Sequence, residues 1–129
     1  MKKVALAVIK KKGTNKFLLV KTRGDSKKKF RSCWFPPGGT VEEKENTKKT
    51  LIREIKEELS IPIKPLKIIT ETKSDDKNQI IQWWLCKSIN QTIILDEEEL
   101  DGFGYFSLKE MENIPLWPAT KKFFKNHGF

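Results

Sequence analysis

Residues 39–61 read GTVEEKENTKKTLIREIKEELSI, and this segment places three glutamates on one face of a predicted helix. A helix turns by about 100° per residue, so Glu57 and Glu58 fall on either side of Glu54 in one narrow stripe. Like charges at these spacings repel by about 0.2–0.5 kcal/mol per pair on an exposed helix. A divalent cation would reverse this repulsion, and clustered carboxylates without His or Cys favour Mg²⁺ or Mn²⁺ over Zn²⁺. The stripe therefore predicts a magnesium site, with manganese as the alternative ion.

The same helix carries an apolar side that is expected to hold it to the rest of the molecule. Ile52, Ile55 and Leu59 lie on an arc next to the glutamates, and Leu51 lies at the border between the two. One side of the helix is thus predicted to pack and the other side to carry the chemistry.

The ends of the helix and the loop before it are also marked in the sequence. Asn46 or Thr47 is expected to cap the first turn, and Pro62, two residues after Ser60, prevents the helix from continuing. Upstream, residues 34–39 read WFPPGG, in which proline fixes the backbone and glycine lets it approach a ligand. The segment therefore predicts a shaped loop that leads into the helix.

These residues resemble the signature of the Nudix hydrolases, which include the MutT-like nucleotide pyrophosphohydrolases. The signature is Gly, five residues, Glu, seven residues, then Arg-Glu-aliphatic-any-Glu-Glu-any-Gly-aliphatic. This sequence matches it at Gly39, Glu45, Arg53, Glu54, Ile55, Glu57, Glu58 and Ile61. One position departs, because Ser60 stands where the family has Gly, and a left-handed Ser there would cost up to about 1 kcal/mol. A solvated acidic helix face is the alternative interpretation.

The resemblance implies an α/β fold, the Nudix-type α/β/α sandwich with a mixed β-sheet, as a single domain that covers the whole chain. It also implies Mg²⁺-dependent hydrolysis of a phosphoanhydride in a nucleoside diphosphate linked to a further group X. In that scheme the metal is held by Glu54, Glu57 and Glu58 together with the backbone carbonyl of Gly38. Glu57 is also the candidate general base, and Arg53 is expected to orient the carboxylates through its i, i+4 spacing from Glu57.

Two further residues gain a predicted role from the resemblance. Many relatives carry a catalytic or metal-binding Glu six residues before an aromatic residue, usually Trp, that opens a strand. Here Glu99 stands six residues before Tyr105; the two preceding glutamates, or a solvated acidic loop, are the alternatives. Family members also often place an Arg that contacts phosphate at the start of the polar loop 22–32, which makes Arg23 the candidate.

The predicted substrate follows from the chain length and from the lead-in to the helix. Both resemble the small family members that split nucleoside triphosphates into monophosphate and pyrophosphate, and in this scheme Phe35 and Thr120 bind substrate. The member that acts on oxidised guanine nucleotides has an Asn after Pro-Ala near its C-terminus, whereas Thr120 follows Pro118-Ala119 here. A hydroxyl does not offer the paired donor and acceptor of an amide. A nucleoside triphosphate is therefore the predicted substrate, with 8-oxo-dGTP as one form to consider.

Two alternatives to a triphosphate pyrophosphohydrolase stay open. One is a Nudix enzyme that acts on ADP-ribose, a dinucleoside polyphosphate or the 5′ end of RNA, and the other is a non-catalytic Nudix domain that binds a nucleotide or RNA. Many enzymes that act on ADP-ribose are marked by a Pro beyond the signature, where this chain has Asp76. Enzymes that act on dinucleoside polyphosphates are marked by a Tyr, where this chain has Asn78. A pure binding domain has no need to keep three repelling carboxylates together, which favours an enzyme.

The chain is strongly basic, with a net charge of +9, and its cations are 23 Lys and 3 Arg. The lysines come in short groups spread along the chain, as at 10–12, 27–29, 48–49 and 121–122. Because recognition of bases and phosphates favours the Arg guanidinium, a solvated basic surface is preferred over an RNA-binding patch. The predicted partner is a small nucleotide, and the oligomeric state is left open.

Short apolar runs predict the elements that surround the helix. Residues 4–9 and 17–21 are expected to be strands joined by a hairpin turn at 13–15. Residues 65–73 and 80–89 are expected to form a second hairpin.

The C-terminal part is predicted to hold a strand at 102–108, a short helix capped by Ser107, and a closing helix at 119–126. Phe123 and Phe124 of the closing helix are expected to cover one face of the sheet.

The sequence also carries expectations about location. No apolar run approaches the ~20 residues that a membrane span needs, and the first nine residues are too short for a secretion signal. Cys33 and Cys86 stand outside any CxxC or paired metal spacing and fit reduced thiols. A cytoplasmic protein without membrane association is predicted.

Overall fold

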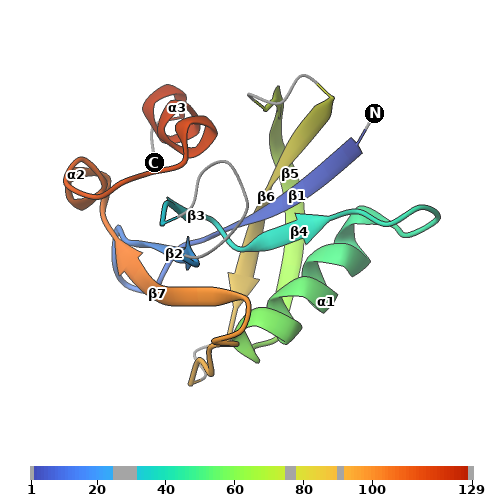
Figure 1. The fold of residues 1–129 in the computed structure, drawn as a ribbon, viewed down its shortest axis with the longest axis horizontal. Coiled ribbons are helices and arrows are strands. Elements are labelled where there is room, and N and C mark those ends of the chain that lie inside the picture. Colours follow the sequence, from blue (N-terminus) through green and yellow to red (C-terminus); the bar gives the residue numbers. More distant parts are fainter. Residues whose placement is uncertain (1, 25–31, 75–77, 90–91, 128–129) are drawn as a thin grey trace.

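The computed structural model describes residues 2–24, 32–74, 78–89 and 92–127. Two β-sheets form the centre of the molecule, with the longest helix at one side and the C-terminal helix at the other (Figure 1). The elements in chain order are β1 (Lys2–Ile9), β2 (Phe17–Thr22), β3 (Trp34–Phe35), β4 (Gly38–Thr40), α1 (Thr47–Leu59), β5 (Ile63–Lys73), β6 (Gln79–Ser88), β7 (Leu100–Phe106), α2 (Leu108–Met111) and α3 (Pro118–Asn126).

The larger sheet has the strand order β4-β1-β6-β5, in which β1 and β6 run parallel and the other neighbours are antiparallel. The smaller sheet has the order β3-β2-β7 and is antiparallel throughout. The predicted α/β architecture with a mixed sheet is therefore confirmed.

Two neighbouring tryptophans of β6 divide the interior into two hydrophobic clusters. Successive residues of a strand face opposite sides of the sheet. Trp84 packs in the cluster that contains the buried face of α1, whereas Trp83 packs with Phe123 and Phe124 of α3. The rings of Trp83 and Phe123 are stacked, with centroids 4.2 Å apart and planes at 5°. The closing helix thus covers the face opposite to α1, as predicted.

The predicted hairpin between the first two strands forms only at its turn, where the Lys11 N–H donates to the Lys16 carbonyl at 2.8 Å, and the strands do not pair beyond it. β1 and β2 lie in different sheets, and in the described part of the chain one isolated bridge, between Lys10 and Phe17, links them. Both sides of β1 are already paired, with β4 and β6, and both sides of β2 are paired with β3 and β7. The predicted β5–β6 hairpin is confirmed, and residues 75–77 of its turn lie outside the described residues.

α1 begins and ends where the sequence predicts. Asn46 Oδ1 accepts a hydrogen bond from the Lys49 backbone N–H at 2.8 Å, which caps the first turn. Ser60 follows the last helical residue in the left-handed conformation, with φ of +59°, and its N–H donates to the Lys56 carbonyl at 3.0 Å. A serine therefore holds a position at which glycine would be relaxed.

The buried face of α1 is rotated relative to the expectation. Leu51 is fully buried, whereas Ile52 is 43% exposed, so the expectation that Ile52 packs in the core is wrong. Glu58 is 8% exposed and lies on the buried side. The segment before β7 covers this side, because the N–H groups of Ile94 and Asp96 donate to carbonyls of the last turn of α1 at 3.0 and 2.8 Å.

The C-terminal part follows the predicted order of elements. β7 begins at Leu100, two residues earlier than expected. Ser107 caps α2 through a reciprocal capping box with Glu110, as its position before the helix predicts. None of the helices in the described ranges is long and apolar enough to cross a membrane.

Replacement of Ser60 by glycine is expected to raise the free energy of unfolding by about 1 kcal/mol, because glycine has no Cβ to strain the left-handed conformation. Urea denaturation of the parent and of Ser60→Gly measures this difference. Ser60→Ala is the matched control, since it keeps the Cβ and should give no such gain. A Ser60→Gly protein no more stable than Ser60→Ala would contradict the explanation.

Candidate functional site

The site is built where α1 meets the edge strand β4. Gly39 of β4 lies against the side chain of Glu54: a Cβ at position 39 would stand 2.5 Å from Glu54 Cδ and 2.7 Å from its Oε1. A larger residue at position 39 would therefore push the carboxylate away. The glycine of the signature is required here because it leaves room for the first glutamate of the stripe.

Arg53 lies at the centre of a group of carboxylates. Its Nε and Nη2 donate to the two carboxylate oxygens of Glu45 at 2.9 and 3.1 Å. Its Nη1 donates to Glu54 Oε1 at 3.2 Å and to Glu57 Oε2 at 3.5 Å. The pairing with Glu57 that the sequence predicts is thus present but long, and the two-pronged bond to Glu45 is the strongest of the set. These carboxylates raise the pKa of Arg53, first of all because Glu45 accepts hydrogen bonds from the guanidinium.

Glu45 joins the loop that precedes α1 to the helix itself. Besides Arg53, its Oε1 accepts hydrogen bonds from Thr50 Oγ1 at 2.7 Å and from the Glu42 N–H at 3.2 Å. The hydrogen bonds from Arg53 and then Thr50 lower the pKa of Glu45 from 4.5 to about 2. The carboxylate is therefore ionised over the whole physiological range, and it fixes the guanidinium beside the other glutamates.

The three glutamates of the stripe differ in exposure. The side chain of Glu54 is 21% exposed and that of Glu57 is 57% exposed, whereas Glu58 is buried. Within the described ranges, no three His, Cys, Asp or Glu side chains form a ready-made metal-holding group. Arg53 instead takes the position between Glu54 and Glu57, so it supplies the positive charge that these two carboxylates share in this arrangement.

The charge of Glu99 acts on the same group. Burial raises the pKa of Glu54, the Arg53 guanidinium opposes this, and the charges of Glu57 and Glu99 raise it further. Glu99 is distant in the sequence, yet it lies close enough to repel Glu54. Glu99 therefore lies within electrostatic range of Glu54.

The loop that carries Glu99 is held from two sides. The Asp96 carbonyl accepts hydrogen bonds from the N–H groups of Glu99 and Leu100 at 3.1 and 3.0 Å. The Asp96 N–H donates to the Glu58 carbonyl at 2.8 Å, which attaches the loop to α1. On the other side, the Gly24 N–H donates to Asp101 Oδ2 at 2.8 Å.

Arg23 lies beside this acidic loop. Its Nη1 donates to the backbone carbonyl of Glu97 at 2.5 Å, two residues before Glu99. The predicted phosphate-binding residue is thus near the carboxylate group in this structure. The greater part of the polar loop that follows it, residues 25–31, lies outside the described residues.

Gly38 is buried in the edge strand, and its backbone fits the predicted ligand role. A Cβ at this position would collide with the carbonyl oxygen of Ala5. On either side of Gly38, the Pro37 carbonyl accepts from β1 at 2.8 Å and the Val41 N–H donates to β1 at 2.9 Å. In an antiparallel pair, successive residues of one strand direct their backbone N–H and C=O groups alternately toward the partner strand and away from it. The Gly38 carbonyl therefore points away from β1.

Of the other two predicted substrate-binding residues, Thr120 lies in the first turn of α3 and Phe35 lies in β3. Phe35 is half-buried, and its ring meets Trp117 edge to face with centroids 6.1 Å apart. Thr120 is fully buried, and its backbone N–H donates to the Trp117 carbonyl at 2.9 Å. Its Oγ1 has no hydrogen-bond partner among the described residues. Phe35 and Thr120 thus both contact Trp117.

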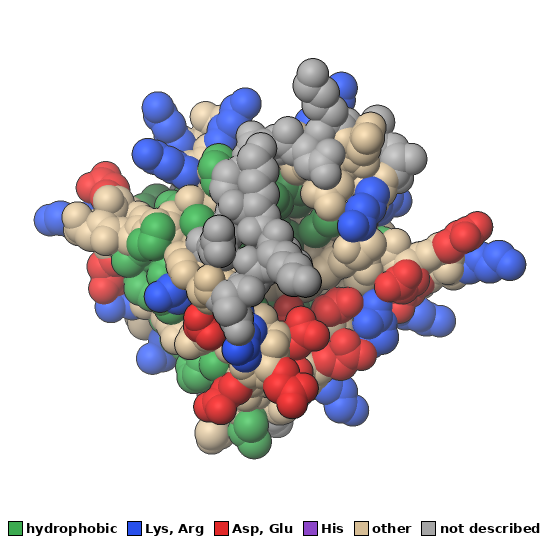
Figure 2. Space-filling view, viewed as in Figure 1, with side chains coloured by type: hydrophobic (Ala, Val, Ile, Leu, Met, Phe, Trp, Pro, Cys, Tyr) green, Lys and Arg blue, Asp and Glu red, His purple; other side chains and the backbone are tan. Residues whose placement is uncertain are grey.

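Acidic side chains gather on one part of the surface. Figure 2 shows them over α1 and the segment before β7, while lysines project around the rest of this face. A negative patch on a chain of net charge +9 is a local feature, and it lies over α1, the helix that carries Glu54 and Glu57.

The comparison with known families agrees with this geometry. The family model described as the NUDIX domain matches residues 1–127. The chain belongs to the Nudix family. Within that family, the residues around Gly39 and Arg53 are those of the signature, and Ser60 is a departure from it.

Several solved structures share the fold. A MutT NUDIX hydrolase from Burkholderia pseudomallei has 22% identity and a TM-score of 0.79, with 94% of this chain and 93% of that chain covered. The E. coli ORF135 protein has 26% identity and a TM-score of 0.70, with 92% and 82% covered. An ADP-ribose pyrophosphatase from Streptococcus suis has 22% identity and a TM-score of 0.73, with 92% and 81% covered. A comparison with curated protein sequences gave no match. Family membership and these neighbours support a Nudix hydrolase.

Sequence reasoning missed two residues that support the site. Thr50 is fully buried within α1 and bonds to Glu45, and a lone hydroxyl on the apolar side of the helix was the available signal. Asp101 bonds to the Gly24 N–H. No spacing in the sequence indicates that pair, because it joins segments that only the fold brings together.

Replacement of Gly39 by alanine is expected to lower nucleotide hydrolysis by about 100-fold, because the new Cβ displaces the Glu54 carboxylate. Steady-state rates and circular dichroism spectra of the parent and variant measure activity and folding. Gly102→Ala is the control, since the nearest side-chain atom to its Cβ is Trp34 Cη2 at an ordinary 3.6 Å. Full activity in a folded Gly39→Ala protein would contradict the geometry.

Replacement of Glu45 by glutamine is expected to reduce the fall in the free energy of unfolding as the pH is lowered below 4.5. The folded-state pKa of Glu45 is about 2 against 4.5 normally, so its contribution is complete above pH 4.5 and is lost as pH falls toward 2. Urea denaturation at a series of pH values between 2 and 6 tests this. Glu43→Gln removes an exposed carboxylate from the same loop and should leave the profile unchanged; equal profiles for both variants would refute the role of Glu45.

Proposed function

We propose that this Nudix protein is a Mg²⁺-dependent pyrophosphohydrolase that cleaves a nucleoside triphosphate into a nucleoside monophosphate and pyrophosphate. The observation that carries the proposal is the group of carboxylates around Arg53. The charges of Glu57 and Glu99 act on Glu54 there, and Glu45 holds the arginine in place. Such a group is costly without a ligand, and a cation with a polyphosphate substrate would use it.

The donors around Gly39 fit a hard cation. They are all oxygen atoms, and the described part of the site has no His or Cys ligand to favour zinc. We assign the metal to Glu54, Glu57, Glu58, Glu99 and the carbonyl of Gly38, with Mn²⁺ as the substitute ion. When bound, the ion would neutralise phosphate oxygens and lower the pKa of the attacking water.

The residues of the chain divide the remaining tasks. Glu57 is the most exposed of the stripe, with a side chain 57% exposed, so it is the proposed acceptor of the proton from the attacking water. Arg53, fixed by Glu45, holds the carboxylates of Glu54 and Glu57 in place through its hydrogen bonds. Arg23, beside the acidic loop, is the proposed contact for a phosphate group of the substrate. Water attack on a phosphorus atom then breaks one phosphoanhydride bond, and the pyrophosphate group leaves.

The substrate base is assigned to the aromatic region at the start of α3. Phe35 and Trp117 offer ring surfaces, and the Thr120 hydroxyl, buried in this structure without a partner among the described residues, is the group assigned to bond a polar edge of the base. A single hydroxyl favours broad rather than strict base selection. Both cysteines are free thiols, which supports a reducing compartment such as the cytoplasm.

Replacement of Glu57 by glutamine is expected to lower hydrolysis by about 10²- to 10⁴-fold, since glutamine cannot accept the proton. Release of pyrophosphate and phosphate is measured with Mg²⁺, with Mn²⁺ and with EDTA. The panel holds ordinary nucleoside triphosphates, 8-oxo-dGTP, ADP-ribose, a dinucleoside polyphosphate and triphosphate-ended RNA. The control is Glu112→Gln, the same change at an exposed glutamate that follows α2.

Pyrophosphate release from triphosphates that needs the metal and is lost in Glu57→Gln but not in Glu112→Gln supports the proposal. Turnover of ADP-ribose or RNA in place of triphosphates would move the substrate assignment to that class. Binding of nucleotides without turnover of any compound would instead indicate a non-catalytic domain.

A further inference from the structure

A row of lysines crosses the larger sheet at the end where β1 and β6 finish. Lys64 of β5 and Lys87 of β6 are direct partners in the antiparallel register. Lys10 follows Ile9, whose partner in β6 is Cys86, so Lys10 lies next to Lys87 on the other side. Neighbouring strands lie about 4.8 Å apart, so three exposed ammonium groups stand on adjacent strands.

These side chains share one face of the sheet with a fourth lysine. Lys67 is the partner of Leu85, which lies two residues before Lys87 and therefore on the same face. That face also carries Trp83, which packs under α3. Lys10, Lys64, Lys67 and Lys87, the lysine row, thus lie on the face opposite to α1 and its glutamates.

The register of these lysines is unfavourable for the isolated protein. Like charges directly opposite each other in a sheet destabilise it. No member of the lysine row has a carboxylate within 4.0 Å among the described residues, whereas Lys16 pairs with Glu110 at 3.1 Å. Lys16 is the one lysine of the described residues with such a partner, so what distinguishes this group is its cross-strand register.

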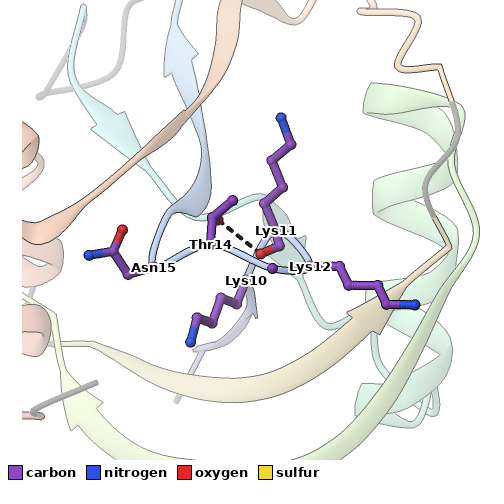
Figure 3. Close-up of a pocket in the computed structure, with 6 residues that line it drawn as sticks. Lys10, Lys11, Lys12, Thr14 and Asn15 are labelled. Atoms are coloured by element: carbon purple, nitrogen blue, oxygen red, sulfur yellow. Dashed lines mark hydrogen bonds between the residues drawn. The ribbon is translucent and has the colours of Figure 1, made fainter.

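A pocket lies at one end of the row. It has a volume of about 590 Å³ and is lined by residues 10–15, the turn that follows β1. Figure 3 shows the side chains of Lys10, Lys11 and Lys12 spreading from it in different directions. The Lys11 ammonium lies over the Tyr105 ring at 5.2 Å, which leaves Lys10 and Lys12 to extend the positive surface.

We propose that the lysine row binds the phosphate backbone of single-stranded RNA, independently of base sequence. A chain of phosphodiesters supplies repeated negative charges that relieve the repulsion across the strands. Lysines act as point charges and lack the paired donors of arginine, so phosphates are recognised and bases are not. The surface is separate from the proposed catalytic residues, and it does not depend on the proposed hydrolysis.

Binding is measured by fluorescence anisotropy with a labelled 20-nucleotide single-stranded RNA, at several salt concentrations, without metal. In the test variant the four lysines of the row become glutamine. The control variant has the same net charge and carries glutamine at four other exposed lysines, Lys49, Lys56, Lys73 and Lys109. The row variant should lose about 0.7 per lysine from the slope of log affinity against log salt, and at least about tenfold in affinity at low salt.

The control variant should keep most of the affinity of the parent, and Glu57→Gln should bind RNA like the parent whether or not hydrolysis is found. Equal losses in the row and control variants would show a general charge effect and overturn the proposal. Failure of the parent to bind RNA would overturn it as well. The proposal would also be overturned if the row substitutions weakened the binding of inorganic polyphosphate but left the binding of RNA unchanged.

A single substitution separates binding from folding. Lys64→Glu creates an opposite-charge pair with Lys87, so it should raise the urea midpoint while it weakens RNA binding. A more stable protein with unchanged RNA affinity would mean that the row is a solvated surface and would contradict the proposal.

Discussion

The two-pronged bond between Arg53 and Glu45 is the interaction on which the site depends. It ties the loop after β4 to the middle of α1, at 2.9 and 3.1 Å, and it leaves one nitrogen of the guanidinium to face Glu54 and Glu57. The arginine therefore acts as an internal counter-ion at a fixed place. Without it, the repulsion among clustered carboxylates would act on side chains that only the helix backbone holds.

The second constraint is the strand β6, whose neighbouring tryptophans face opposite ways. Trp84 belongs to the cluster beneath α1, and Trp83 stacks on Phe123 of α3. The larger sheet thus has two covered faces, and charges of opposite sign collect on them. The carboxylates of α1 lie on one side and the lysine row lies on the other. In both groups like charges stand together at a cost in stability, which is the physical basis for assigning each a ligand of opposite charge.

Much of the site could be predicted from the sequence, because its spacing is local. Helix geometry alone predicts Glu54, Glu57 and Glu58 on one stripe, although Glu58 is buried in the structure, and the capping role of Asn46 follows from the side chain before the first turn. The position of Glu99 was predicted by resemblance, and its effect on Glu54 came only from the fold. The bond of Thr50 to Glu45 was missed although the two residues are near in the chain, whereas that of Asp101 to Gly24 was missed because it links distant segments whose approach depends on packing.

The sequence by itself therefore determined the family, the carboxylate stripe, the ends of α1 and the β5–β6 hairpin, all of which rest on contacts between residues near in the chain. Only the tertiary structure decided that β1 and β2 join different sheets and that Leu51 rather than Ile52 is buried. It also decided that Lys64 faces Lys87. The reason is that strand partners and helix rotation are chosen by competition among distant apolar surfaces, and periodicity in one segment cannot record which partner wins.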